Sequence, residues 1–162
     1  MDKKRKEGLP AGRQGFTLIE ILVVIGLIAI LAAIVLIAIN PARQFAQARN
    51  TQRTSNVETI MNALGQYLAD NKGVALTTTS CTGLTTAIGS RTASTSVGTG
   101  GSNLGACLGT YIATGIPMDP VGGTADNTGY DISVDSIGRY MVCADGYNEA
   151  ALNNPGAYCL IR

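Results

Sequence analysis

The sequence of 162 residues lacks the residues and motifs on which most enzymes depend. It contains no histidine and no tryptophan, and it has neither a Gly-x4-Gly-Lys-Ser/Thr phosphate loop nor a Gly-x-Ser-x-Gly nucleophile elbow. The glycines at 98–101 have no lysine after them, and no pair of acidic residues marks an evident pocket. We therefore expect no catalytic residue, no cofactor and no enzymatic activity.

Charged residues are also scarce, at 14% of the chain, and they are unevenly placed. The first 15 residues carry two acidic residues, Asp2 and Glu7, and the basic residues Lys3, Lys4, Arg5, Lys6 and Arg13. Basic residues that flank a membrane segment are retained on the cytoplasmic side. We therefore expect a cytoplasmic amino terminus and an exported carboxyl-terminal part.

An apolar run from Gly15 to Ile39 dominates the sequence. Only Thr17, Glu20 and Gly26 interrupt the strongly apolar residues between positions 16 and 39. As a helix this run would be ~36 Å long, which is enough to cross a hydrocarbon core of ~30 Å. The sequence therefore predicts a transmembrane helix over 16–39 and leaves room for one small domain after it.

Two ordinary interpretations of this run compete with a more specific one. A secretory signal peptide has a shorter apolar core and a small-residue cleavage site after it, and neither is present here. A plain membrane anchor fits the length and the flanks, but it gives Glu20 no role. A carboxylate near the centre of a span costs ~2.5–3.5 kcal/mol, although one that lies a helical turn from the end can reach the interface.

The residues that precede and open the run spell RQGFTLIE, from Arg13 to Glu20. This stretch resembles the processing motif of the type IV pilin family, which includes the pseudopilins of type II secretion. The resemblance implies a leader peptide over 1–15 that a membrane prepilin peptidase removes after Gly15. It also implies N-methylation of Phe16 and makes Glu20 the fifth residue of the mature chain.

The resemblance further implies that the chain polymerises through its apolar helix. In a filament, the new amine at Phe16 of one subunit is a natural partner for Glu20 of a neighbour. An unpaired buried charge costs ~3–5 kcal/mol, so we expect Glu20 to set the register of assembly rather than to add net stability. The implied partners are further copies of the chain, the prepilin peptidase, and a pilus assembly platform with its ATPase; no direct contact with nucleic acid is indicated.

Beyond the membrane segment, residues 40–73 predict a continuing amphipathic helix. Pro41 is expected to kink or locally melt one long helix over about 16–71. Arg43, Arg49 and Arg53 suit a solvated or headgroup-level surface. From residue 57 apolar positions recur every three or four residues, which predicts a packed face; they are Val57, Ile60, Met61, Leu64, Tyr67 and Leu68. Gly73 is typical of a position just past a helix end.

The exported part, 74–162, contains a polar segment and a predicted sheet. Residues 77–105 are mostly threonine, serine and glycine and predict a long loop, with at most a short element near 84–88. Two-residue alternation over 130–135 and 139–144 predicts a hairpin, and a weaker strand is expected at 157–161. The fold class expected is α+β: a long amino-terminal helix whose second half packs on a small antiparallel sheet at about 128–161, as the resemblance also implies.

The IPMDP stretch at 116–120 resembles the Pro-x-Asp-Pro turn of major pseudopilins, but Val121 stands where that pattern has tryptophan. In those proteins a nearby loop can bind calcium. Four residues here carry suitable oxygens: Asp119, Asp126, Asn127 and Asp131. Their spacing matches no calcium loop, so we expect an ordinary polar turn and no metal.

Four cysteines, Cys81, Cys107, Cys143 and Cys159, lie in the predicted exported part. An even number there indicates two disulfides, for which three connectivities exist. A zinc site is disfavoured because the cysteines are not closely paired and histidine is absent. We expect Cys81–Cys107 and Cys143–Cys159, because each closes a modest loop; the second would resemble the carboxyl-terminal cystine loop of many type IV pilins.

These features favour a structural subunit of a type IV pilus or a pilus-like filament. The IPMDP stretch keeps a major-pseudopilin-like subunit of a type II secretion system as an alternative. A single-pass membrane protein with an exported binding module is the second alternative, in which the apolar run is only a tether.

Overall fold

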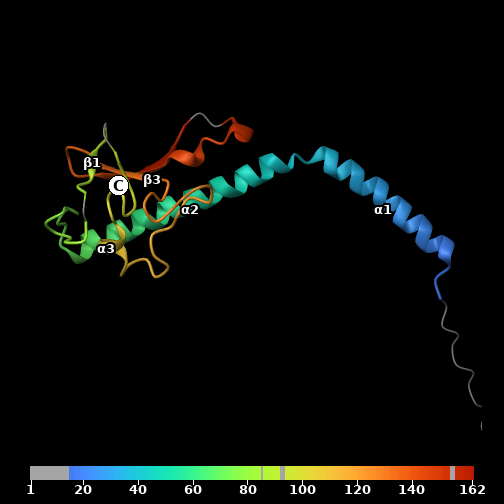
Figure 1. Cartoon of the computed structure of the whole chain (residues 1–162), viewed down its shortest axis with the longest axis horizontal. Helices are drawn as coiled ribbons and strands as arrows, with labels where there is room; N and C mark the ends of the chain where they lie inside the picture. The colour runs from blue at the N-terminus through green and yellow to red at the C-terminus, as the bar shows by residue number, and fades with distance from the viewer. Residues whose placement is uncertain (1–14, 85, 92–93, 154–155) are drawn as a thin grey trace, which may run out of the picture. The chain divides into compact units, whose positions relative to one another are not determined.

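The computed structural model describes residues 15–84, 86–91, 94–153 and 156–162. The chain divides into two compact units, one that extends to Asn40 and one from Pro41 to Arg162. In its described residues the first unit contains one helix, and the second unit is an α+β domain (Figure 1). The predicted fold class is therefore confirmed.

The helix of the first unit, α1, extends from Leu18 to Ala38. Thr17 caps its amino terminus: its backbone is extended, and its hydroxyl accepts a hydrogen bond from the Glu20 amide at 3.3 Å. No residue of α1 is buried. By length and composition α1 can cross a membrane, so the span predicted over 16–39 is present as a helix of suitable size.

The second unit begins with α2, a helix of 30 residues from Pro41 to Asp70. The long helix expected over about 16–71 is interrupted just before Pro41, because α1 ends at Ala38 and Ile39 is extended. Pro41 instead opens α2, where its missing N–H breaks no hydrogen bond and its fixed φ suits a helix. At the other end, Gly73 has a φ of +80° and its amide donates to the Leu68 carbonyl at 2.7 Å, which closes the helix as the sequence predicts.

A five-stranded sheet covers one face of α2. The predicted hairpin forms from β3 (Tyr130–Val134) and β4 (Tyr140–Ala144), with Ile132 opposite Val142. The strand β5 (Tyr158–Ile161) pairs with β4 in the antiparallel sense. The sheet is mixed, however, because β1 (Gly89–Ser90) runs parallel to β3, while β2 (Thr95–Ser96) is antiparallel to it.

The polar segment at 77–105 contributes more to the domain than a loop. It supplies β1 and β2, and several of its apolar side chains join the core: Leu84, Val97 and Leu104 are buried, and Ile88 is partly buried. A short helix, α3 (Gly105–Leu108), follows it. The surrounding threonines, serines and glycines show no strong periodicity. In the sequence, the isolated apolar residues are therefore the feature that indicates a packed segment.

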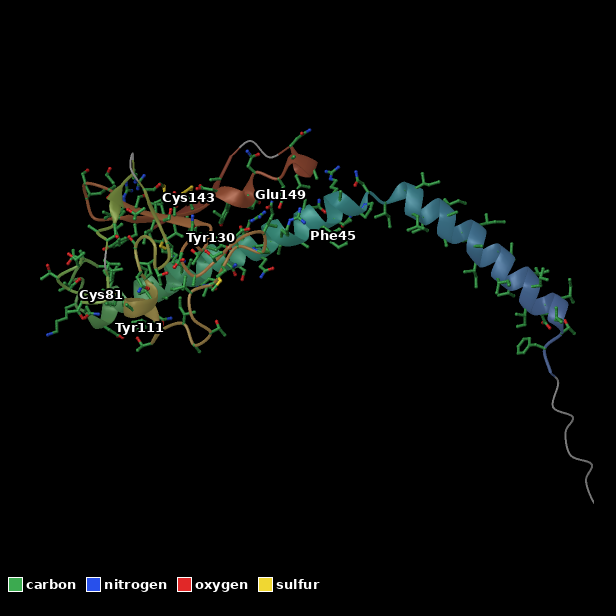
Figure 2. The ribbon with its side chains drawn as sticks, viewed as in Figure 1. Phe45, Cys81, Tyr111, Tyr130, Cys143 and Glu149 are labelled. Atoms are coloured by element: carbon green, nitrogen blue, oxygen red, sulfur yellow. A yellow bond between two sulfur atoms is a disulfide. The ribbon has the colours of Figure 1, made fainter. Side chains whose placement is uncertain are left out.

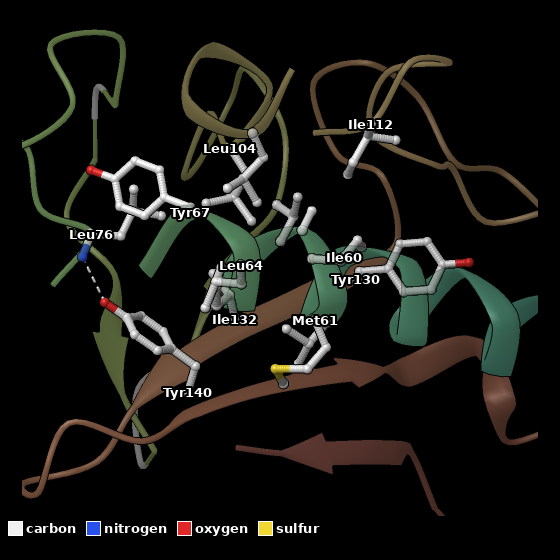
Figure 3. Packing of buried hydrophobic residues seen from close by; sticks show 14 of the residues in the cluster. Ile60, Met61, Leu64, Tyr67, Leu76, Leu104, Ile112, Tyr130, Ile132 and Tyr140 are labelled. Carbon is white, nitrogen blue, oxygen red and sulfur yellow. Dashed lines mark hydrogen bonds between the residues drawn. The ribbon is translucent and has the colours of Figure 1, made fainter. Parts of the chain in front are cut away.

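The core lies between α2 and the sheet (Figure 3). The apolar face predicted on α2 is buried at Val57, Ile60, Met61, Leu64 and Tyr67, whereas Leu68 is partly buried. Two sheet tyrosines bring hydroxyl groups into this region and find partners there: Tyr140 accepts from the Leu76 amide, and Tyr130 accepts from the Asn56 side chain, both at 2.8 Å. The predicted amphipathic helix therefore packs as expected.

Two disulfides close the domain (Figure 2). Cys81, which follows α2, is joined to Cys107 in α3, and Cys143 in β4 is joined to Cys159, its direct neighbour in β5. A loop of ~15 residues closed in this way is stabilised by about 3 kcal/mol in the chain-entropy model. The second bridge encloses residues 144–158, called here the C-terminal loop, which contains the short 3-10 helices η1 (Asp145–Tyr147) and η2 (Ala150–Leu152).

Arg53 contradicts the expectation that the arginines of α2 are solvated, because it is only 2% exposed. Its guanidinium donates to both oxygens of Asp119, at 2.5 and 2.9 Å, and to Glu149 at 2.6 Å. Arg49 adds two hydrogen bonds to Glu149, at 2.7 and 2.8 Å. These four residues, called here the ion cluster, join α2 to the IPMDP segment and to the C-terminal loop.

The acidic and basic side chains of the ion cluster stabilise one another's charged forms. Hydrogen bonds from Arg49 and Arg53 lower the pKa of Glu149 to about 2. Burial alone would raise the pKa of Asp119, but the hydrogen bonds from Arg53 and from the Val121 amide outweigh it and leave this pKa below its ordinary value. Both carboxylates are therefore ionised next to the arginines. The hydrogen bonds between them offset the cost of burying the charges.

Gly65 offers a test of the helical assignment, since it is an exposed residue in the interior of α2 with free space around an added Cβ. We expect Gly65→Ala to raise the free energy of unfolding by about 0.5–1 kcal/mol, because alanine loses less backbone entropy in a helix. Urea unfolding of the detergent-solubilised chain would measure this. Gly73→Ala is the matched control: it places alanine at positive φ and should destabilise.

Arg53 offers a second test. Arg53→Met should lower the free energy of unfolding by about 3–5 kcal/mol, because the buried charge of Asp119 would lose its partner, while Glu149 would keep only Arg49. Arg139→Met is the control, since that arginine pairs with Asp135 through a side chain that is 55% exposed, and its loss should cost less than about 1 kcal/mol. Equal effects of the two substitutions in the same unfolding experiment would contradict the role assigned to the cluster.

Candidate functional site

The predicted processing position lies just before α1. Gly15, Phe16 and Thr17 are not helical, and the helix begins only at Leu18. The Phe16 side chain is 77% exposed, and nothing lies within 4 Å of the position that a Cβ on Gly15 would occupy. The peptide bond between Gly15 and Phe16 is therefore in a non-helical and open segment, as a protease needs. Residues 1–14, the rest of the predicted leader, lie outside the described residues.

Glu20 lies in the first turn of α1, four residues after Phe16. A carboxylate at this end of a helix is favoured by the unpaired amides and the helix dipole. Glu20 is exposed, and none of the ion pairs found among the described residues involves it. Its charge therefore has no counterpart within the described part of its own chain.

The rest of α1 presents an uncovered apolar surface on all sides. Its large side chains are between 47% (Val24) and 87% (Ile37) exposed. A helix that is apolar around its whole circumference is stable only when lipid or other apolar helices surround it. The carboxylate of Glu20 therefore lies near the start of a helix whose surface is otherwise apolar and exposed.

The residues considered as calcium ligands are engaged elsewhere. Asp119 belongs to the ion cluster, and Asp126 accepts a hydrogen bond from the Thr99 hydroxyl. Asn127 accepts from the Gly129 amide at 2.9 Å, and Asp131 from the Ser94 hydroxyl at 2.8 Å. Within the described ranges, no group of three or more His, Cys, Asp or Glu side chains is placed to hold a metal ion.

Sequence reasoning missed the ion cluster although a signal for it exists. The buried face of α2 has members before Val57 at the same alternating spacing of three and four residues, namely Ala46, Asn50 and Arg53. Asn50 and Arg53 are polar, so a search for apolar periodicity does not detect them. Reasoning from sequence also gave no role to Phe45, which is 66% exposed on α2.

Comparison with known proteins adds one finding. The family model described as the prokaryotic N-terminal methylation motif matches residues 10–36. No match was found among curated proteins or among solved structures. The matched segment contains the open Gly15–Phe16 bond, the unpaired Glu20 and most of α1. The chain therefore carries the amino-terminal methylation motif of type IV pilin and pseudopilin precursors.

Proposed function

We propose that this protein is the precursor of a structural subunit of a type IV pilus or a pilus-like filament. The observation that carries the proposal is the first unit: a methylation motif in register with a helix that has no buried residue. Such a helix requires a bilayer before assembly and other helices after it. The function is therefore structural and collective, and it needs no catalytic residue.

Processing begins at the bond between Gly15 and Phe16. A membrane prepilin peptidase cuts there and removes the basic leader, whose charges would otherwise hold the chain on the cytoplasmic side. Phe16 then becomes the N-methylated first residue. The cut leaves α1 intact, because the helix starts two residues further on. The mature chain is thus still anchored in the membrane, but it can be extracted toward the outside.

Assembly then uses α1 as the core of the filament. Helices from many copies bundle away from water, and the amine of Phe16 pairs with Glu20 of a neighbouring copy. Leaving either charge unpaired in that core costs ~3–5 kcal/mol, so the pair selects one register. An assembly platform and its ATPase supply the work of extraction. The second unit remains outside the membrane as the filament surface, where two disulfides fit an oxidising compartment.

A major-pseudopilin-like subunit of a type II secretion system is the alternative, and the IPMDP segment at 116–120 favours it. In this structure Asp119 of the segment accepts two hydrogen bonds from Arg53 of α2. A single-pass anchored binding module is a second alternative. It shares the membrane helix with the other two, but it predicts an uncut amino terminus.

The mature amino terminus is the direct test. In cells that contain a prepilin peptidase, mass spectrometry should find a chain that begins at Phe16 and carries one extra methyl group. Gly15→Val should remain at the precursor mass, because a branched side chain next to the scissile bond obstructs the peptidase while the free space around Gly15 leaves the fold unaffected. An uncut wild-type chain in such cells would support the anchored module instead.

Glu20 tests the assembly step. Glu20→Ala should be cut and methylated normally, yet its filament yield in sheared fractions should fall about tenfold or more, since the Phe16 amine would lose its partner. Glu58→Ala is the matched control, because Glu58 is an exposed acid on α2 outside the apolar helix. Wild-type filament yield from Glu20→Ala would refute the role given to this carboxylate.

A further inference from the structure

An exposed isoleucine lies in the turn between β3 and β4, residues 135–139, called here the hairpin tip. Ile137 is 72% exposed, more than any other large apolar side chain described in the second unit. The Asp135 carboxylate fixes the turn, because it accepts from the Ile137 amide at 3.1 Å and from the Arg139 amide at 2.8 Å. The side chains of Arg139 and Arg91 donate to the same carboxylate, at 2.8 and 3.0 Å. Ile137 is therefore an apolar side chain presented by a preorganised turn.

Single exposed apolar residues are common on protein surfaces, so Ile137 alone indicates no partner. A second observation is a pocket of about 170 Å³ in the same unit, called here the Leu104 pocket. Leu104 and Val97, which line it, are fully buried, whereas Met118, which also lines it, is exposed. The pocket therefore extends from the surface toward the core. An apolar cavity of ~150 Å³ accommodates benzene, so the Leu104 pocket has room for an isoleucine side chain.

The Leu104 pocket suits an uncharged side chain. None of the described residues that line it is charged. The hydroxyl of Thr128, a buried lining residue, donates to the Val97 carbonyl at 2.7 Å, so this donor needs no partner from a ligand. Two larger hollows of the second unit differ, because charged side chains line part of each. An apolar group that enters the Leu104 pocket displaces water without removing a charge from solvent.

Strand β3 separates Ile137 from the pocket of its own chain. Thr128 lies two residues before β3, and the Val97 amide donates to the carbonyl of Tyr130, the first residue of the strand, at 2.8 Å. Ile137 lies three residues after the other end of β3. The strand itself covers ~16 Å at ~3.3 Å per residue, and all of it is paired with β4. Ile137 can therefore enter the Leu104 pocket only of another copy.

The charges around the hairpin tip and around the pocket are complementary. At the tip two basic residues, Arg91 and Arg139, stand against one acid, Asp135. Between Arg91 and Arg139 the sequence has no other basic residue, and this stretch includes every described residue that lines the pocket. It carries an exposed acid, Asp126, directly after the lining residue Ala125. Complementary charges of this kind attract the two surfaces and orient them.

We propose that the Leu104 pocket binds Ile137 from the hairpin tip of a second copy of this chain. The proposal rests on the proposed function, because it requires copies that assemble into a filament. The contact joins two different patches of the same molecule, so each copy uses its tip on one neighbour and its pocket on another. A contact of this heterologous type can repeat along an open chain of copies. It links the second units of neighbouring copies directly.

Substitutions of Ile137 test the contact in the full-length chain. Ile137→Ser should be processed normally and keep the thermal stability of the monomer, because the side chain is exposed. Its filament yield in sheared fractions should fall about tenfold, since the apolar anchor is lost. Ile137→Val should keep most of the yield. Val74→Ser is the matched control, because Val74 is also an exposed apolar residue of the second unit, and it should assemble like the wild type.

The pocket is tested independently by filling it. A Cβ on Gly105 would lie 3.7 Å from the Ile116 side chain and 3.4 Å from that of Asn103, and all three residues line the pocket. Gly105→Leu should therefore occupy the space that Ile137 needs and lower filament yield as Ile137→Ser does. The double variant should be no worse than either single one, because both remove one contact. Losses that multiply in the double variant, or wild-type yield from both single variants, would refute the proposal.

Photo-crosslinking identifies the partner surface. With p-benzoylphenylalanine in place of the exposed Ser136, which leaves Ile137 intact, filaments are assembled from a mixture of light and isotopically heavy copies. After irradiation, mass spectrometry should find bonds between light and heavy copies that end within residues 97–105 or 116–128, the segments that form the pocket. The same probe in place of Glu58, on α2, is the control and should not give these bonds.

The crosslinking result separates the contact from the filament. Crosslinks from position 136 only within one copy, only to lipid, or only to other parts of another copy would each overturn the docking of Ile137 while the filament itself remains. If wild-type copies form no filament in cells that contain the assembly machinery, the proposed function fails, and the contact fails with it.

Discussion

The second unit depends on one buried guanidinium. Arg53 contacts Asp119 and Glu149, which are far from it and from each other in the sequence. Through these contacts one residue of α2 holds the IPMDP segment and the C-terminal loop against the same helix. Pairs of this kind add little net stability compared with apolar packing, but they penalise any arrangement that leaves a charge unpaired. Here the penalty fixes the position of two irregular segments that otherwise have few apolar side chains with which to dock.

The sequence predicts much of this structure because the periodic elements follow simple rules. The apolar run predicts α1, the spacing from Val57 to Tyr67 predicts the packed face of α2, and two-residue alternation predicts the β3–β4 hairpin. Each of these elements has a regular residue pattern of its own, so the element can be recognised in the sequence without knowledge of what it packs against. The disulfide pairs also follow from local loop closure.

The remaining features depend on contacts between distant segments, which a single sequence does not display. The strands β1 and β2 are two residues long, and their pairing with β3 comes from the sheet edge rather than from their own composition. Arg53 looks solvated until Asp119 and Glu149 are brought to it. For the processing position the opposite holds: Gly15, Phe16 and Glu20 are recognisable from a short motif, because they lie within one contiguous segment of sequence.

The two disulfides have a mechanical consequence. In the filament proposed above, subunits would be pulled through α1, and the load would enter the second unit at Pro41 through the first turns of α2. A domain under load lengthens by releasing chain, but the bridges span 26 and 16 positions of sequence, and those segments cannot be drawn out while the covalent bonds remain. The extensible chain is thereby reduced to the helices and the segment between Cys107 and Cys143. Under such a load the second unit would therefore lengthen first through its helices and residues 108–142, with the two cystine loops still closed.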